Sequence, residues 1–123
     1  MEFKEKELAA LLKLGASMST ADGNIDENEI KFMEREIHNF NLDLVTLHKI
    51  IEDSKTLEPI EAITIMAKML DEQKKYMCGF LATLMSIDGK LDENEIKLWK
   101  LVCSLTNTPT MNILEAIDFW TNN

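Results

Sequence analysis

The sequence DGNIDENEIK, which runs from Asp22 to Lys31, returns as DGKLDENEIK from Asp88 to Lys97. Eight of the ten positions are identical, and a ninth exchanges isoleucine for leucine. The same separation of 66 residues aligns apolar positions outside the two segments, as between Ile37 and Cys103. Agreement over this length predicts an internally duplicated chain in which neither half buries its apolar face alone.

Each copy is predicted to form a helix, a tight turn and a second helix. Apolar residues at the spacing of an amphipathic helix precede both turns. The glycine of each turn suits the residue after a helix end, because glycine adopts left-handed backbone angles without a steric clash. The spacing Asp-x-x-Glu that follows is typical of a capped helix start. These residues are Gly23, Asp26 and Glu29 in the first copy and Gly89, Asp92 and Glu95 in the second. The buried faces of the new helices are expected to be Ile30, Met33, Ile37 and Phe40 in the first copy, and Ile96, Trp99, Val102 or Cys103, and Leu105 in the second.

The composition indicates a single all-α domain over residues 1–123. A chain of 123 residues with 46% hydrophobic and 28% charged residues can fill one core. Only four glycines and two prolines argue against an all-β fold with many tight corners. Further apolar periodicity raises the expected number of helices to about seven. Repeat 1 is expected to span about residues 3–54 and repeat 2 about residues 72–121.

The charge and the apolar runs exclude several classes of function. A formal charge of −9 disfavours nucleic-acid binding, which depends on basic residues that neutralise phosphates. No apolar run approaches the roughly 20 residues that a membrane span needs, and no secretory signal is visible, so a cytoplasmic protein is expected. The two cysteines, Cys78 and Cys103, form no CxxC motif and are interpreted as reduced core residues.

The repeated turn matches only the second half of an EF-hand loop. With its glycine at the sixth position, carboxylates occupy positions five, nine and twelve. Positions one and three, which should carry oxygen ligands, are Met18 and Thr20 in one copy and Leu84 and Ser86 in the other. A degenerate EF-hand-like calcium sensor is therefore kept as an alternative function.

The paired pattern Ala-Asp-Gly-x-Ile-Asp-x-x-Glu resembles the TerB family, including the related domain of DjlA-type co-chaperones. It stands at Ala21–Glu29, and at Ile87–Glu95 with Ile in place of Ala and Leu91 in place of Ile. The resemblance implies two helical hairpins packed about a pseudo-twofold axis, with both acidic turns in one neighbourhood. It also implies a link to bacterial tellurite resistance and stress-response systems, and it implies no catalytic activity.

If the two turns meet, six carboxylates could bind a divalent cation, with Ca²⁺, Mg²⁺ or Mn²⁺ preferred by oxygen ligands. They are Asp22, Asp26, Glu29, Asp88, Asp92 and Glu95. Helix capping is the competing interpretation for the Asp and Glu of each helix start. The leading hypothesis is a non-enzymatic TerB-like module that binds a protein partner through this acidic surface. An enzyme with paired carboxylates is disfavoured because no histidine stands in or beside the motifs.

Overall fold

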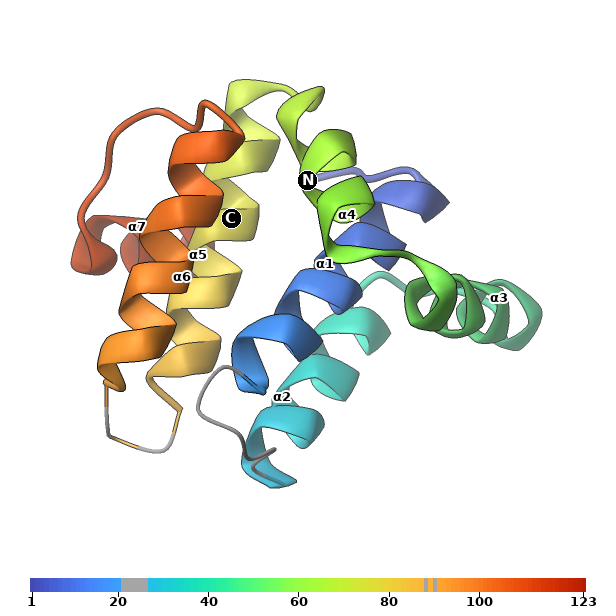
Figure 1. The fold of residues 1–123 in the computed structure, drawn as a ribbon. Coiled ribbons are helices and arrows are strands. Elements are labelled where there is room, and N and C mark those ends of the chain that lie inside the picture. The colour runs from blue at the N-terminus through green and yellow to red at the C-terminus, as the bar shows by residue number, and fades with distance from the viewer. Residues whose placement is uncertain (21–26, 88, 90) are drawn as a thin grey trace.

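The computed structural model describes residues 1–20, 27–87, 89 and 91–123, and within them the fold is entirely helical (Figure 1). Its helices are α1 (Glu5–Ser19), α2 (Glu27–His38), α3 (Leu44–Thr56), α4 (Pro59–Ala67), α5 (Asp71–Met85), α6 (Glu93–Leu105) and α7 (Ile113–Thr121). The prediction of an all-α chain with about seven helices is confirmed. None of the helices in the described part of the chain has the length and apolarity that a membrane crossing requires.

Helix α5 forms the centre of the main core. Its run from Tyr76 to Ala82 is buried at every position, because α7, α1, α6 and α2 all contact it. Phe80 stacks on Phe32 of α2, with the ring centroids 5.5 Å apart and the planes 14° from parallel. The same cluster includes Leu11 and Met18 of α1. Figure 1 shows α5, α6 and α7 grouped on one side and α1 to α4 on the other.

A smaller core lies beneath α3. It consists of Leu8 and Ala9 of α1, Ile37 of α2 and Ile50 of α3. Ile50 is the one residue of α3 that is buried, so this helix is held mainly through its contacts with α1.

Two residues expected in the core are exposed instead. Ile30 is 40% exposed and Leu105 is 52% exposed. Thr106, which follows the last residue of α6, is fully buried, and its hydroxyl donates to the Val102 carbonyl at 2.8 Å. The neighbouring Leu105 therefore faces outward. In α2 the buried stripe begins at Glu29 and continues through Phe32, so Ile30 lies off that stripe.

Candidate functional site

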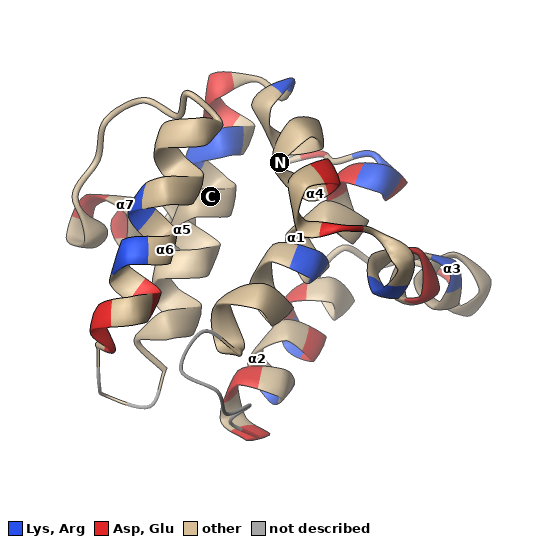
Figure 2. Cartoon of the chain, viewed as in Figure 1, with Lys and Arg blue, Asp and Glu red and all other residues tan. Residues whose placement is uncertain are grey.

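The helices that flank the two repeated segments have the ends next to these segments on the same side of the fold. Helix α1 contacts α2, α5 and α6, and α2 also contacts α5. In Figure 1 the last turns of α1 and α5 and the first turns of α2 and α6 all lie toward the lower edge. Figure 2 shows acidic residues in the first turns of both α2 and α6. We call this region the acidic end; its described carboxylates are Glu27, Glu29, Asp92, Glu93 and Glu95.

Three of the six predicted cation ligands, Asp22, Asp26 and Asp88, lie outside the described residues. Asp92 is described and caps α6, since its Oδ1 accepts hydrogen bonds from the backbone N–H groups of Asn94 at 2.8 Å and Glu95 at 3.1 Å. The capping interpretation is thus confirmed for Asp92. Among the described residues, no three His, Cys, Asp or Glu side chains are grouped so that they could hold a metal ion together.

Corresponding glutamates of the two copies have the same solvent exposure: one pair is buried and the other is exposed. Glu29 and Glu95 are only 5% and 4% exposed. Two residues before each, Glu27 and Glu93 stand in solvent and pair with the lysine one turn later, at 3.5 Å and 3.4 Å. Such exposed pairs contribute little to stability, so the exposed glutamates are available to a partner.

The repeated segments concentrate the charge of the chain. Residues 22–31 hold four acidic residues against one lysine, and residues 88–97 hold four against two. These twenty residues therefore carry a net charge of −5, more than half of the −9 of the whole chain. An acidic end of this kind favours a partner with a basic surface.

Replacing the cap residue Asp92 by alanine is expected to lower the free energy of unfolding by about 1 kcal/mol, because two N–H groups of the first turn of α6 lose their acceptor. Urea unfolding measures the change. Asp92→Asn keeps an acceptor oxygen and removes the charge, so it should recover most of the loss. An alanine variant as stable as the parent would contradict the capping role.

A second group of interacting side chains involves both cysteines. Cys78 of α5 and Cys103 of α6 place their Sγ atoms 2.8 Å apart, and the Thr108 hydroxyl lies 3.7 Å from the Cys78 sulfur. The hydrogen bond between the thiols lowers the pKa of Cys78 and raises the pKa of Cys103. The pair therefore loses its first proton readily and its second proton only with difficulty. The interpretation as reduced core residues missed this pairing.

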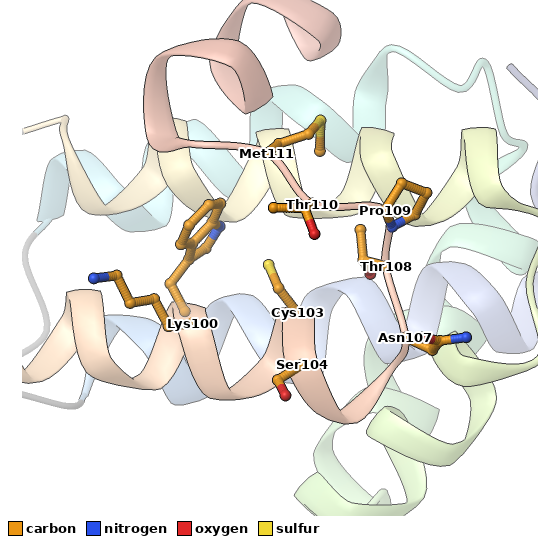
Figure 3. Close-up of a pocket in the computed structure, with 9 residues that line it drawn as sticks. Lys100, Cys103, Ser104, Asn107, Thr108, Pro109, Thr110 and Met111 are labelled. Atoms are coloured by element: carbon orange, nitrogen blue, oxygen red, sulfur yellow. The ribbon is translucent and has the colours of Figure 1, made fainter.

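A cavity of about 360 Å³ opens beside Cys103 (Figure 3). Its wall is formed by α6 and by the segment that connects α6 to α7, including Thr108 and Met111. In Figure 3 the sulfur of Cys103 points from α6 toward that segment. Among the predicted acidic ligands that the structure describes, Glu29, Asp92 and Glu95, none lines this cavity.

The third group is a buried carboxylate with two donors. Glu36 of α2 is 2% exposed. The Tyr76 hydroxyl donates to its Oε1 at 3.0 Å and the indole N–H of Trp120 donates to its Oε2 at 2.7 Å. Burial raises the pKa of Glu36, and the two hydrogen bonds offset part of that rise. Burial and the neighbouring carboxylate also raise the pKa of Tyr76, which stays protonated as a donor.

Comparison with known proteins relates the chain to a solved structure. No family model and no curated protein matches the sequence. Among solved structures, the chain is similar to the crystal structure of a protein of unknown function from Porphyromonas gingivalis W83, with a TM-score of 0.83 and 36% sequence identity. The similarity covers 100% of this chain and 99% of that chain. Membership of the TerB family stays a prediction from the repeated motif. At this identity and coverage, the chain belongs to the same family as the Porphyromonas gingivalis protein.

Proposed function

We propose that the chain is a non-enzymatic, TerB-like helical module that binds a protein partner through its acidic end. The observation that carries the proposal is that four helix ends, one pair from each copy of the repeat, lie toward the same end of the fold (Figure 1). A duplicated acidic motif could form a single surface only with this arrangement. The partner is expected to present lysine and arginine side chains, because complementary charge orients and accelerates association.

A divalent cation is the second and separable part of this proposal. Asp92 is engaged as a helix cap and Glu29 and Glu95 are buried, so a cation at this end would depend on Asp22, Asp26 and Asp88. Carboxylates close together repel one another, and a bound Ca²⁺, Mg²⁺ or Mn²⁺ would relieve that repulsion. The role in stress response or tellurite resistance rests on the family resemblance alone.

The calcium-sensor alternative receives less support from the described residues. Met18 and Leu84 stand where an EF-hand loop has its first ligand, and both are fully buried inside α1 and α5. A fully buried apolar side chain cannot coordinate Ca²⁺, which takes oxygen ligands. We therefore prefer binding of a protein partner through the acidic end to calcium sensing as the function.

The partner part is tested by removing exposed charge from the acidic end. Glu27→Gln/Glu93→Gln is expected to weaken binding to a partner captured from extracts of the source cells by about 3- to 10-fold, and to weaken its salt dependence. The matched control is Glu52→Gln/Glu72→Gln. These two glutamates are also exposed and paired with lysines, at 3.4 Å and 3.5 Å, but lie in α3 and α5. Equal effects of the two double variants would contradict the proposal.

The cation part is tested by thermal unfolding of metal-stripped protein with and without Ca²⁺, Mg²⁺ or Mn²⁺. A cation at about 100 times its dissociation constant adds about 2.7 kcal/mol, which raises the midpoint of a domain of this size by several degrees. The shift should be lost in Asp22→Asn/Asp88→Asn. If the parent shows no shift with any of the three metals, the cation part is wrong, while binding of the partner is decided by the previous test.

A further inference from the structure

We propose that Cys78 and Cys103 form a reactive dithiol that a small hydroperoxide oxidises to a disulfide between α5 and α6. The proposal concerns a different part of the fold from the acidic end and is independent of the function proposed there.

The first observation is the placement of the two sulfur atoms. Neighbouring helices hold them 2.8 Å apart, and the atoms need to approach only to the bond length of about 2.0 Å of a disulfide. The indole N–H of Trp99 on α6 donates to the carbonyl of Cys78 on α5 at 2.8 Å. This buried hydrogen bond ties the two helices together one turn from Cys103, so the thiols are positioned before any reaction.

The second observation is unequal access. Cys78 is fully buried, whereas Cys103 is partly exposed and lines the cavity of about 360 Å³. An oxidant that enters the cavity therefore contacts Cys103 first, because Cys78 is buried behind it. This arrangement matches an attacking thiol with a resolving thiol beside it.

The third observation comes from the repeat. A shift of 66 residues places Leu12 and Ile37 at the positions of Cys78 and Cys103. In the first copy these two residues belong to one apolar cluster. Aliphatic side chains can therefore fill these positions, so the need for packing does not explain why the second copy has two thiols there.

The chemistry balances with a hydroperoxide as the oxidant. The Cys78 sulfur, which loses its proton first, lies 2.8 Å from the Cys103 sulfur and takes the Cys103 proton as Cys103 attacks one peroxide oxygen. An S–O bond forms, the O–O bond breaks, and the leaving oxygen takes a proton from solvent to become water or an alcohol. The Cys78 sulfur then attacks the Cys103 sulfenic acid. The S–S bond forms, the S–O bond breaks, and the hydroxyl leaves as water with the Cys78 proton. The protein loses two electrons and two protons, which the peroxide receives.

The test treats the reduced full chain with hydrogen peroxide and follows thiol content and intact mass. Both thiols are expected to disappear together, with a mass lower by two hydrogens, no cross-linked dimer, and full recovery with dithiothreitol. In Cys78→Ser the Cys103 sulfenic acid should persist and be trapped by dimedone. In Cys103→Ser the buried thiol should react roughly 10-fold more slowly.

The matched control is Cys78→Leu/Cys103→Ile, which introduces the residues that the first copy has at these positions. Because it has no thiol, its mass change measures oxidation of the eight methionines alone. The proposal is overturned if peroxide leaves both thiols intact, if the disulfide forms between two chains, or if Cys103 becomes a sulfinic acid while Cys78 keeps its thiol. The wild-type thiol count decides these outcomes even if a serine variant fails to fold.

Discussion

Gly79→Ala is expected to lower the free energy of unfolding by about 2–3 kcal/mol, because there is no space for a methyl group where α5 crosses α7. A Cβ atom at position 79 would meet the carbonyl oxygen of Ala116 and lie 2.6 Å from the Cβ of Trp120. Neither is the flexible end of a side chain, so the helices themselves would have to separate. The pair α5 and α7 makes the most extensive helix contact among the described elements, and chemical denaturation measures the loss.

Gly15→Ala is the matched control for this prediction. Gly15 is also in a buried part of a helix, α1, but an added Cβ would lie 2.8 Å from the sulfur of Met33, with its next contacts at 3.4 Å. The unbranched Met33 side chain can move away. Alanine also gains about 1 kcal/mol over glycine in helix propensity. Gly15→Ala should therefore change stability by no more than about 1 kcal/mol. Equal losses in the two variants would contradict the close approach of α5 and α7.

Much of the fold could be predicted because its signals are local. Helical periodicity gave the number of helices, and the spacing Asp-x-x-Glu placed the start of α6, where Asp92 accepts hydrogen bonds from residues two and three positions ahead. The errors at Ile30 and Leu105 have a common cause. The buried positions of α2 and α6 include Glu29, Glu36 and Glu95, and Thr106 is buried directly after α6. A pattern of apolar residues does not contain these polar positions.

The cysteine pair and the buried Glu36 group could not be predicted, because their members are distant in sequence. Cys78 and Cys103 are 25 residues apart, and Glu36 lies 40 residues from Tyr76 and 84 from Trp120. No motif joins residues at such separations; only the packing of α5 against α6, and of α2 and α7 about α5, brings them together. The repeat held one signal. Where one copy has aliphatic residues and the other has two cysteines, the difference marks a position that packing alone does not explain.

Glu36→Ala is expected to lower the free energy of unfolding by about 3 kcal/mol. The substitution removes two hydrogen bonds to a carboxylate and leaves the Tyr76 hydroxyl and the Trp120 indole N–H without their acceptor, and each loss of this kind costs roughly 1–3 kcal/mol. Tyr76 is 8% exposed, so water replaces the lost acceptor poorly. Urea unfolding at neutral pH measures the effect. A change below about 1 kcal/mol would show that the donors find other acceptors.

Glu36→Gln separates the charge of this group from its hydrogen bonds. The amide oxygen can accept from Trp120 and the amide nitrogen can donate to the Tyr76 hydroxyl, so this variant should stay within about 1 kcal/mol of the parent at neutral pH.

The pH dependence of stability should differ between Glu36→Gln and the parent. Because burial raises the folded-state pKa of Glu36 above the ordinary 4.5, the folded chain holds this proton to higher pH than the unfolded chain does. The stabilisation that comes from protonation of Glu36 in the folded chain is then fully present below about pH 4.5 and is lost as the pH rises through the raised value. Asp43 has a lowered pKa because the Thr46 backbone N–H donates to it. Its contribution therefore falls with acid below 3.8, outside the interval in question. Between about pH 7 and pH 4.5, the parent should gain stability relative to Glu36→Gln as the pH falls. A constant difference across that interval would mean that Glu36 titrates alike in the folded and unfolded chains.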